Sequence, residues 1–190
     1  LRVFNRTPEK CASLVARGAQ LAPDVASAVR DADVVITMVG TPVDVEDLYL
    51  SHDGILEVSA PGAYLIDMTT SSPQLARDIS EVAELSGKHA FDAPVTGGPQ
   101  GAAAGTLTIF CGTDAETLAG VRDVLACMGS KIVCFGAAGK GQLAKLANQT
   151  ALAGAMVGFA EGLAFAKQAG LDLAQTLDAL AGGMADSKAL

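Results

Sequence analysis

One stretch of the sequence, residues 139–149, gathers side chains that could transfer a proton. Glycines at positions 139 and 141 open a helical pattern, and Lys145 follows about one turn later. Gln149 lies four residues after Lys145, so both side chains share one helix face, and Asn148 lies beside them. An ammonium group, an amide and a glycine-rich helix entrance therefore converge, which makes Lys145 the first candidate for a catalytic residue.

Simpler interpretations of this stretch exist. A lysine on an alanine-rich helix is most often a solvated side chain. The run Gly139-x-Gly141-x-x-Ala144 also imitates the turn that binds the diphosphate of a dinucleotide. That turn requires a second strand ending in an acidic residue about 20 residues later, whereas Glu161 falls inside the continuing helical pattern. A Walker loop is excluded too, because Lys140 is followed by glycine rather than by Ser or Thr.

Polar clusters follow several predicted strands. They are Asn5-Arg6-Thr7, Gly40-Thr41-Pro42, Thr69-Thr70 and Thr96-Gly97-Gly98. Ligands of open α/β sheets bind outside the carboxyl ends of the strands. Hydroxyls and glycine amides suit ribose, carboxylate and phosphate groups, although the same residue types are ordinary turn formers. Four clusters at corresponding positions indicate a ligand site better than any one of them does.

The cluster Asn5-Arg6-Thr7 bears on the choice of cofactor. A domain selective for NAD usually has an acid here that holds the ribose 2′-hydroxyl, whereas an arginine accommodates a 2′-phosphate. The acid position is occupied by Asn5 and is followed by Arg6. A guanidinium group binds phosphate in a strong, oriented way. We therefore expect a bound dinucleotide to be NADP(H) in preference to NAD(H).

Strand and helix patterns alternate over about the first 135 residues, which predicts an α/β domain with a largely parallel sheet. Predicted strands cover residues 1–4, 34–39, 63–67, 89–92, 107–111 and 131–135. Predicted helices cover residues 8–17, 22–31, 73–87 and 114–128, with two short helical stretches after Pro42. The run at 34–39 is continuously apolar and β-branched, so we expect it to be buried on both faces.

The strand patterns stop near residue 138. One helical pattern of nearly thirty residues follows, and a second covers about 172–181. We therefore expect an α/β domain at 1–138 and the start of an all-α domain at 139–190. The sequence has no initiator Met and begins within a strand pattern, so we expect it to be a fragment.

Composition excludes some classes of partner. Half of the 190 residues are apolar and 18% are charged, so the chain can bury a substantial core. The net charge of −8 argues against nucleic acid or an anionic membrane as a general partner, and no apolar run is long enough to span a bilayer. No C-x-x-C pair occurs, so we expect no metal site and interpret the cysteines as reduced core thiols of a cytoplasmic protein. They are Cys11, Cys111, Cys127 and Cys134.

Taken together, the motifs resemble those of the β-hydroxyacid dehydrogenases. That family includes 3-hydroxyisobutyrate dehydrogenase, tartronate semialdehyde (2-hydroxy-3-oxopropionate) reductase and 6-phosphogluconate dehydrogenase. The matching runs are Asn5-Arg-Thr7, Asp67-Met-Thr-Thr-Ser-Ser-Pro73, Asp92-Ala-Pro-Val-Thr-Gly-Gly98 and Gly139-Lys-Gly-Gln-Leu-Ala-Lys145-Leu-Ala-Asn-Gln149. Their order and spacing agree with the family over essentially the whole chain. The Lys-Leu-Ala-Asn-Gln form looks most like the tartronate semialdehyde reductase branch.

The resemblance implies a Rossmann-type doubly wound sheet and a role for each motif. Val39, Gly40 and Thr70 would line the nicotinamide half of NADP(H) or NAD(H), and Asn5, Arg6 and Thr7 would contact the adenosine phosphate. Thr96, Gly97, Gly98 and Gln149 would bind a small β-hydroxyacid. Lys145 matches the family's catalytic lysine, which protonates the carbonyl oxygen during reduction and removes the alcohol proton during oxidation. No metal is required.

Departures from the family pattern limit this interpretation. Thr96 stands where the family usually has Ser, and many members have Asn at the position of Gln149. The family's first strand, its G-x-G-x-x-G turn and its first helix would precede Leu1, and further helices would follow Leu190. We therefore expect the 190 residues alone to bind cofactor weakly and to turn over little.

Other classes of protein share this scaffold. A non-catalytic cofactor-binding or assembly module would be expected to lose the lysine, and an imine reductase usually replaces it with an acid or a phenol. Lys145 argues against both. The Ala and Gly content of the helix at 139–167 would permit close contact in a homodimer or homotetramer, although an intramolecular partner would explain the same composition.

Overall fold

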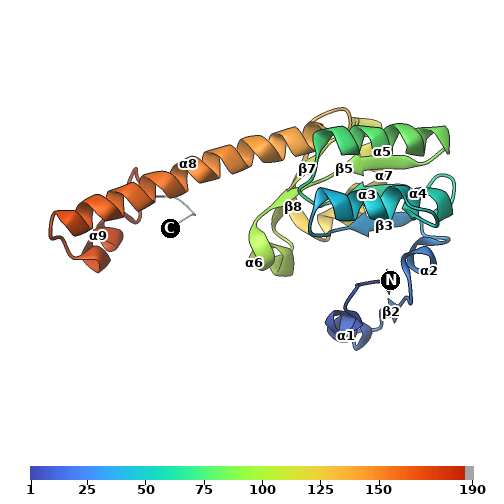
Figure 1. The fold of residues 1–190 in the computed structure, drawn as a ribbon, viewed down its shortest axis with the longest axis horizontal. Helices are drawn as coiled ribbons and strands as arrows, with labels where there is room; N and C mark the ends of the chain where they lie inside the picture. The colour runs from blue at the N-terminus through green and yellow to red at the C-terminus, as the bar shows by residue number, and fades with distance from the viewer. Residues whose placement is uncertain (187–190) are drawn as a thin grey trace. The chain divides into compact units, whose positions relative to one another are not determined.

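A computed structural model describes residues 1–186 of the chain (Figure 1). The chain forms two compact units, Leu1–Lys145 and Leu146–Leu190. The helix α8 (Lys140–Gln168) contributes residues to both. The domain boundary expected after residue 138 stays a prediction, and the last four residues of the expected 139–190 domain lie outside the described residues.

The first unit contains the strands and most of the helices. Its strands are β1 (Arg2–Val3), β2 (Gln20–Leu21), β3 (Val34–Thr37), β4 (Tyr64–Asp67), β5 (His89–Asp92), β6 (Val95–Thr96), β7 (Leu107–Cys111) and β8 (Gly129–Cys134). Its helices before α8 are the 3-10 helix η1 (Pro8–Cys11), α1 (Ala12–Val15), α2 (Val25–Val29), α3 (Pro42–Leu50), α4 (Ile55–Val58), α5 (Pro73–Leu85), α6 (Gly98–Ala104) and α7 (Ala115–Ala126).

The strand pairing is mostly parallel. β1 pairs with β2, and β3, β4 and β5 form a three-stranded parallel sheet in which Thr37, Asp67 and Asp92 stand at one level. β7 pairs in parallel with β8 and antiparallel with the short β6. An isolated bridge between Asp92 and Gly112 joins the end of β5 to the end of β7. The predicted α/β fold, a parallel Rossmann-type sheet followed by a helical segment, is confirmed.

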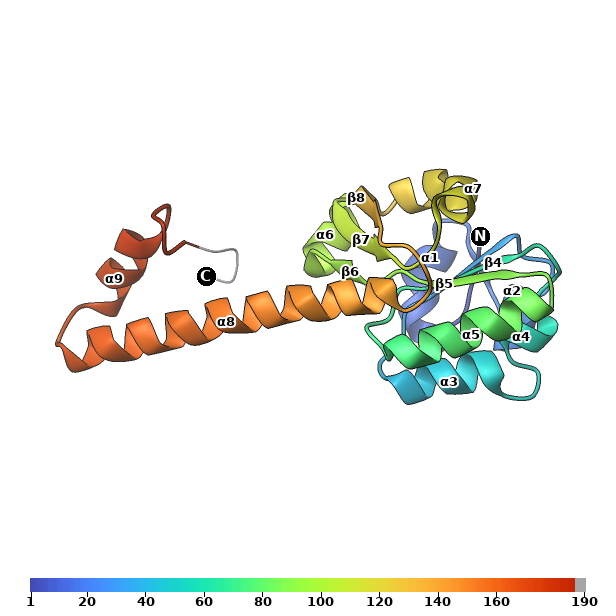
Figure 2. The same ribbon diagram turned by 90° about the horizontal axis from the view of Figure 1, so that it is seen from above.

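Two apolar cores cover the opposite faces of β4. Helices α3, α4 and α5 lie on one face and α7 lies on the other (Figure 2). Leu65 belongs to the first core and Ile66 to the second, and both are fully buried. Adjacent residues of a strand point to opposite faces, so β4 is the central strand of a sheet covered on both sides. Full burial of each side chain contributes about 2 kcal/mol.

Side-chain caps begin several helices where the sequence changes from loop to helical pattern. Asp24, Thr41, Ser72 and Asp114 each accept a backbone N–H from the first turn of α2, α3, α5 and α7 respectively. Such a cap is worth about 1 kcal/mol. Pro42 and Pro73 follow Thr41 and Ser72 directly, where a missing N–H costs nothing.

Several expectations about burial and local structure are wrong. β3 is not buried on both faces, because Ile36 is 38% exposed. The strand pattern expected to continue to residue 39 ends at Thr37. Helix α6 and the short strand β2 were not expected. Cys11 and Cys111 are buried thiols, but Cys127 and Cys134 are exposed, so the core placement fails for two of the four.

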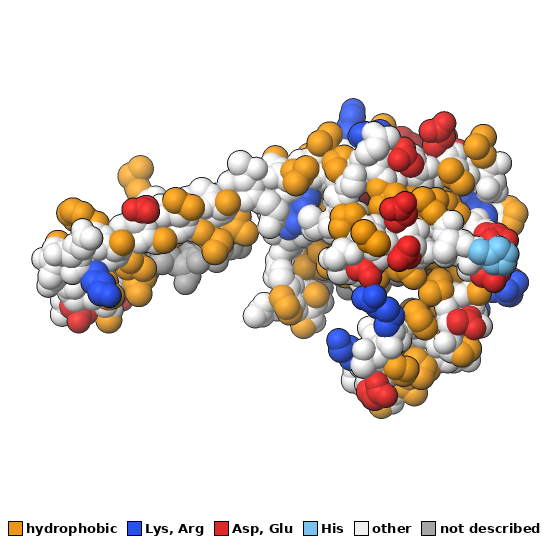
Figure 3. All heavy atoms as spheres, in the orientation of Figure 1, with side chains coloured by type: hydrophobic (Ala, Val, Ile, Leu, Met, Phe, Trp, Pro, Cys, Tyr) orange, Lys and Arg blue, Asp and Glu red, His pale blue; other side chains and the backbone are white. Residues whose placement is uncertain are grey.

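The second unit, within the described residues, is helical. It contains most of α8 and the helix α9 (Leu173–Leu180), which Asp172 caps. Exposed apolar side chains are spread along α8 (Figure 3), and Met156, Val157 and Phe165 are between 57% and 72% exposed. No helix in residues 1–186 combines the length and the apolar character needed to cross a membrane.

Candidate active site

The polar clusters after β3 and β4 lie at one edge of the sheet, because β3, β4 and β5 end in register. The backbone N–H of Val39, just beyond β3, donates to Thr69 Oγ1 over 3.0 Å, which ties the loop after β3 to the loop after β4. Thr69 is buried, whereas its neighbour Thr70 and the residue Gly40 are exposed. The structure therefore brings together the predicted nicotinamide residues Val39, Gly40 and Thr70 at the ends of adjacent strands.

A buried network of hydrogen bonds stands behind these loops. Thr37 Oγ1 donates to Asp67 Oδ1 over 2.8 Å and lies 3.1 Å from the Tyr49 hydroxyl. The same carboxylate oxygen accepts the backbone N–H of Thr69 over 3.2 Å. Burial raises the pKa of Asp67 above its usual value, and it raises the pKa of Tyr49 as well. Such a network fixes the direction in which both loops leave the sheet.

The start of α8 is held by the carboxylate of Asp92, the last residue of β5. Asp92 Oδ1 accepts the N–H of Gly139 and Oδ2 accepts the N–H of Gln142, both over 2.6 Å. Burial raises the pKa of Asp92, although these amides and the nearby Arg77 oppose the shift. The anion at this helix N-terminus is thus a side chain of the protein itself, which gives a physical reason for rejecting Gly139-x-Gly141 as a phosphate loop.

Glycine is required where α8 meets the sheet. A Cβ atom added at Gly141 would stand 2.3 Å from the Phe110 carbonyl oxygen and 2.8 Å from Asp92 Oδ2. Gly139 has a φ of +85°, and a Cβ there would stand 2.5 Å from the Pro73 carbonyl oxygen. Gly141 therefore serves close packing of the helix against β5 and β7, and Gly139 serves close packing against the start of α5. Neither glycine is needed for the binding of a diphosphate.

The side chain of Gln142 joins this helix to the loop after β4. Its Nε2 donates to the Thr69 carbonyl oxygen over 2.7 Å, and its Oε1 accepts the Ser71 N–H over 2.9 Å. Gln142 is only 1% exposed. Sequence reasoning missed both Asp92 and Gln142 as determinants of the site. The available signal was a carboxylate at the end of an apolar strand and a polar residue between Gly141 and the candidate lysine.

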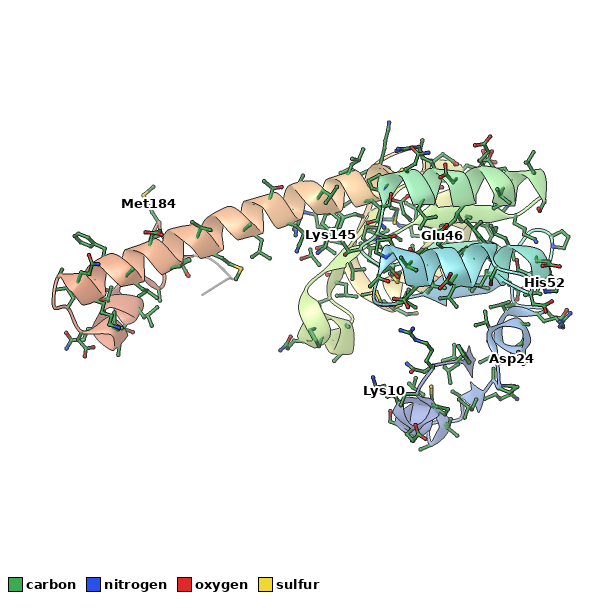
Figure 4. The ribbon with its side chains drawn as sticks, viewed as in Figure 1. Lys10, Asp24, Glu46, His52, Lys145 and Met184 are labelled. Atoms are coloured by element: carbon green, nitrogen blue, oxygen red, sulfur yellow. The ribbon has the colours of Figure 1, made fainter. Side chains whose placement is uncertain are left out.

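Lys145 lies on α8 one turn after Gln142 and is the last residue of the first unit (Figure 4). It is 7% exposed, so the interpretation as a solvated side chain is wrong. Among residues 1–186 it forms no ion pair. Burial lowers the pKa of its ammonium group below the usual 10.5, because removal from water disfavours the charged form. A buried amine without an acidic partner is suited to exchange a proton with a bound ligand.

The cluster Asn5-Arg6-Thr7 follows β1. Asn5 Oδ1 accepts the Thr7 N–H over 2.8 Å, and Thr7 makes no side-chain cap to η1. The Arg6 guanidinium is 79% exposed and lies 2.9 Å from Asp44 Oδ1 at the start of α3. The bonds from Thr41 and the charge of Arg6 lower the pKa of Asp44. A Cβ at Gly40 would lie 3.2 Å from Asp44 Oδ2, so Arg6 reaches the same edge as the loop after β3.

The remaining predicted substrate residues lie in two places. Thr96 ends β6, four residues after Asp92, and Gly98 begins α6. Gly97 has a φ of +130°, and a Cβ there would stand 3.1 Å from Leu107 Cδ2, so the turn requires glycine. Gln149 belongs to the second unit, where its Oε1 accepts from Asn148 Nδ2 over 3.0 Å. Its association with the other site residues stays a prediction.

The only candidate cation cluster in the described part of the chain lies elsewhere. His52, Asp53 and Glu57 approach one another after α3, and all three are exposed. Burial and a closed ligand shell, which a structural metal site needs, are lacking there.

A parallel sheet whose strand-end loops offer hydroxyls, glycine amides and an arginine is the architecture of a nicotinamide-nucleotide-binding domain, and here it is followed by a helix with a buried lysine. The family model described as the NAD binding domain of 6-phosphogluconate dehydrogenase matches residues 1–136. The model for the NAD-binding domain of NADP-dependent 3-hydroxyisobutyrate dehydrogenase matches residues 139–190. The chain belongs to this family of β-hydroxyacid dehydrogenases, as its motifs indicated.

Curated relatives agree with this membership. An oxidoreductase of Bacillus subtilis is 44% identical over 99% of the chain, which covers 65% of that protein. The 3-hydroxyisobutyrate dehydrogenase of Pseudomonas aeruginosa is 42% identical over 90% of the chain and 58% of that protein. The first four relatives are covered over 56% to 65% of their own length, so the chain spans less than two thirds of each.

Solved structures show the same fold. 3-Hydroxyisobutyrate dehydrogenase of Mycobacterium tuberculosis with L-serine superposes with a TM-score of 0.87 and 37% identity, covering all of the chain and 64% of that protein. An imine reductase of Myxococcus stipitatus in complex with NADP⁺ superposes with a TM-score of 0.83 and 26% identity, covering 94% of the chain and 62% of that protein.

Proposed function

We propose that the full-length protein interconverts a small β-hydroxyacid and its semialdehyde or oxo acid, with NADP(H) preferred over NAD(H). The observation that carries this proposal is Lys145, a buried amine without an acidic partner in residues 1–186, one turn from a side chain that binds the loop of Thr70. The function of the family and the names of the relatives supply the reaction class. The substrates considered first are tartronate semialdehyde and 3-hydroxyisobutyrate.

Each group of residues has a distinct part in the proposed reaction. NADPH, when bound, supplies the hydride for the carbonyl carbon. Val39, Gly40 and Thr70 would hold the nicotinamide half of the cofactor. Gly40 and Thr70 are exposed and Val39 is half-buried at the strand ends, which fits such a ligand. Lys145 as an ammonium group would donate a hydrogen bond and then a proton to the carbonyl oxygen as negative charge develops there. In oxidation the neutral amine would accept the proton of the alcohol.

The preference for NADP(H) is inferred from Arg6. Its guanidinium group is exposed and anchored by Asp44 at 2.9 Å, close to the end of β1 where an adenosine ribose would lie. A 2′-phosphate would compete with Asp44 for this arginine and would gain an oriented, charge-assisted contact. NADH offers a hydroxyl at the same place and gains less.

The substrate site is inferred from the turn between β6 and α6. Thr96 offers a hydroxyl, and the Gly97 and Gly98 amides border a turn that no larger residue could form without strain. Hydroxyl and amide donors suit a carboxylate and a hydroxyl group. The amide of Gln149, four residues after Lys145 within α8, is proposed as a further substrate-binding group.

The test compares oxidation of NADPH and NADH by the full-length protein with a panel of carbonyl substrates. The panel contains tartronate semialdehyde, the semialdehydes of other β-hydroxyacids and a cyclic imine. The variants are Lys145→Ala and, as a matched control, Lys140→Ala, because Lys140 is an exposed lysine at the start of the same helix α8. We expect wild type and Lys140→Ala to turn over with NADPH preferred. Lys145→Ala should lose roughly 100-fold or more in kcat and keep its cofactor affinity.

The outcomes separate the alternatives. If wild type reduces the imine and none of the semialdehydes, the protein is an imine reductase. This is the second candidate function, because an imine reductase is among the similar structures. A wild type that binds cofactor but reduces nothing would indicate a non-catalytic module. Full activity of Lys145→Ala would refute the role of the lysine even if the reaction were correct.

We also infer that the full-length protein forms a homodimer or homotetramer. The support is the set of exposed apolar side chains on α8, which includes Met156, Val157 and Phe165. Large apolar side chains exposed along one helix are common at protein interfaces.

A further inference from the structure

We propose that Gln142 is a positioning residue that holds residues 69–71 against the first turn of α8, and so fixes how Thr70 and Lys145 face the bound cofactor and substrate. The inference rests on the proposed function for the roles of Thr70 and Lys145. Gln142 itself would not touch the reacting atoms. Its effect would be transmitted through the loop and the helix that it joins.

Both the nitrogen and the oxygen of the Gln142 carboxamide form hydrogen bonds. Its Nε2 donates to the Thr69 carbonyl oxygen at 2.7 Å, and its Oε1 accepts the Ser71 N–H at 2.9 Å. These backbone partners demand one donor and one acceptor, so they fix the orientation of the amide. Glutamate would offer two acceptors and methionine no strong group. Among side chains of this length, only glutamine satisfies both partners.

The two backbone groups flank Thr70. Thr70 is exposed, whereas Thr69 on one side is buried and also accepts the Val39 N–H through its hydroxyl at 3.0 Å. The loop is thus anchored immediately before and after the residue expected to contact the nicotinamide. Loss of the Gln142 bonds would leave Thr70 on a loop held from one side only.

The main chain of Gln142 is anchored separately. Its N–H donates to Asp92 Oδ2 at 2.6 Å, so the residue joins α8 to the end of β5 as well as to the loop after β4. Lys145 follows three residues later, which places it on the same face of the helix. Both residues are buried, at 1% and 7% exposure. A rotation of the first turn of α8 would therefore move Gln142 and Lys145 together.

The test uses Gln142→Met and Gln142→Glu in the full-length protein. Methionine keeps the length and removes both hydrogen bonds, whereas glutamate keeps the acceptor for Ser71 and removes the donor to Thr69. Gln168→Met is the matched control, because Gln168 is an exposed residue of the same helix. The readouts are the Kd for NADPH, hydrogen exchange of the Ser71 amide, and the kcat, KM and pH profile of turnover. Thermal unfolding gives the folded fraction to which each value is normalised.

We expect Gln142→Met to accelerate exchange of the Ser71 amide and to raise the Kd for NADPH roughly tenfold. Its kcat should fall roughly 100-fold with a smaller change in KM, because misplacement of reacting groups by about 1 Å has effects of that size. Gln142→Glu should keep Ser71 protected and still bind and turn over less well than wild type. Gln168→Met should match wild type.

The proposal is overturned if Gln142→Met stays within twofold of wild type in Kd, kcat and Ser71 exchange per folded molecule. It is also overturned if the losses only track the unfolded fraction, since a purely structural role predicts that result. The Kd for NADPH and the hydrogen exchange of the Ser71 amide are measured without substrate. They therefore decide the role of Gln142 even if wild type reduces none of the semialdehydes in the panel. Lys145→Ala should lose turnover with unchanged Ser71 exchange, which separates the two residues.

Discussion

Lys145 is a cation that the surrounding residues desolvate without neutralising. It is 7% exposed, and no acidic side chain in residues 1–186 pairs with it. The carboxylate of Asp92, which lies at the first turn of α8, is already occupied by the amides of Gly139 and Gln142. Asp92 therefore stabilises the helix that carries the lysine and does not hold the lysine as an ion pair. The pKa of Lys145 is lowered for the same reason, because only burial acts on it.

The lowered pKa predicts opposite pH dependences for the two directions of the proposed reaction. Reduction requires the ammonium form, so kcat/KM should fall as pH rises through the pKa of Lys145. Oxidation requires the neutral amine, so kcat/KM should rise through the same pKa. Both changes should occur below 10.5, the usual value for lysine. Initial rates measured in both directions across alkaline pH provide the check.

Lys145→Arg provides the control for this pH dependence. An arginine stays protonated at every pH used, so it can donate a hydrogen bond to the carbonyl oxygen but can neither give up nor take up the transferred proton. Turnover should therefore fall strongly in both directions, and any residual rate should lack the alkaline pH dependence. A wild-type profile that is the same in both directions would show that another group transfers the proton.

At the scale of elements, the start of α8 packs closely against the rest of the first unit because Gly139 and Gly141 have no side chain at the contact. The helix begins over β5 and β7, and it can approach them because Gly141 faces the Phe110 carbonyl oxygen and the Asp92 carboxylate. Glycine inside a helix costs about 1 kcal/mol relative to alanine. Here that cost is offset by the hydrogen bonds that the close approach allows, and these bonds orient the turn that bears Gln142.

Gly141→Ala should therefore destabilise the first unit by about 3 kcal/mol, because the new methyl group would overlap backbone and carboxylate atoms that cannot move independently. Gly158→Ala is the matched control on the same helix. A Cβ there meets nothing within 4 Å, so this substitution should be neutral or stabilise by up to about 1 kcal/mol. Denaturant unfolding of both variants measures the difference. Equal stabilities would refute the close-packing role of Gly141.

The sequence predicted the elements better than their junctions. Apolar runs and cap residues correctly located β4, β5, β7, α5 and α7, because periodicity and capping are local signals. It also singled out Lys145 from its spacing. It missed the partners of Asp92 and Gln142, which lie 47 to 73 residues away along the chain. Contacts at such separation depend on how the strands are ordered, and no local pattern records them.

Errors of burial have the same origin. The apolar run of β3 resembles a central strand, yet Ile36 is 38% exposed. The apolar residues of a strand show that both of its faces can be buried. They do not show whether another element packs against each face. Cys127 and Cys134 were misplaced similarly, because a thiol in an apolar run can point to either face of its element.

At the scale of the whole molecule, two groups of carboxylates act on stability with opposite signs. Asp24, Asp44 and Asp114 accept hydrogen bonds at helix starts, and these bonds lower their pKa values below 3.8. Their contribution is present above 3.8 and is lost as pH falls below it. Burial raises the pKa values of Asp67 and Asp92. Above 3.8 the unfolded chain has released these protons while the folded chain keeps them, so stability falls with rising pH until the folded pKa is passed.

Asp67→Asn should therefore change how the free energy of unfolding varies with pH, and not only its value at one pH. Asparagine keeps an oxygen for Thr37 and Thr69 and cannot ionise, so the variant should gain stability relative to wild type as pH rises above 3.8. Asp114→Asn is the control, because its deficit relative to wild type should develop below 3.8 and stay constant above it. Unfolding free energies from denaturant titrations between about pH 3 and pH 8 test both curves. If Asp67→Asn ran parallel to wild type throughout, the pKa of Asp67 would have to be the same in the folded and the unfolded chain. Well above 3.8 the buried network at the strand ends would then carry a full negative charge next to the proposed cofactor site.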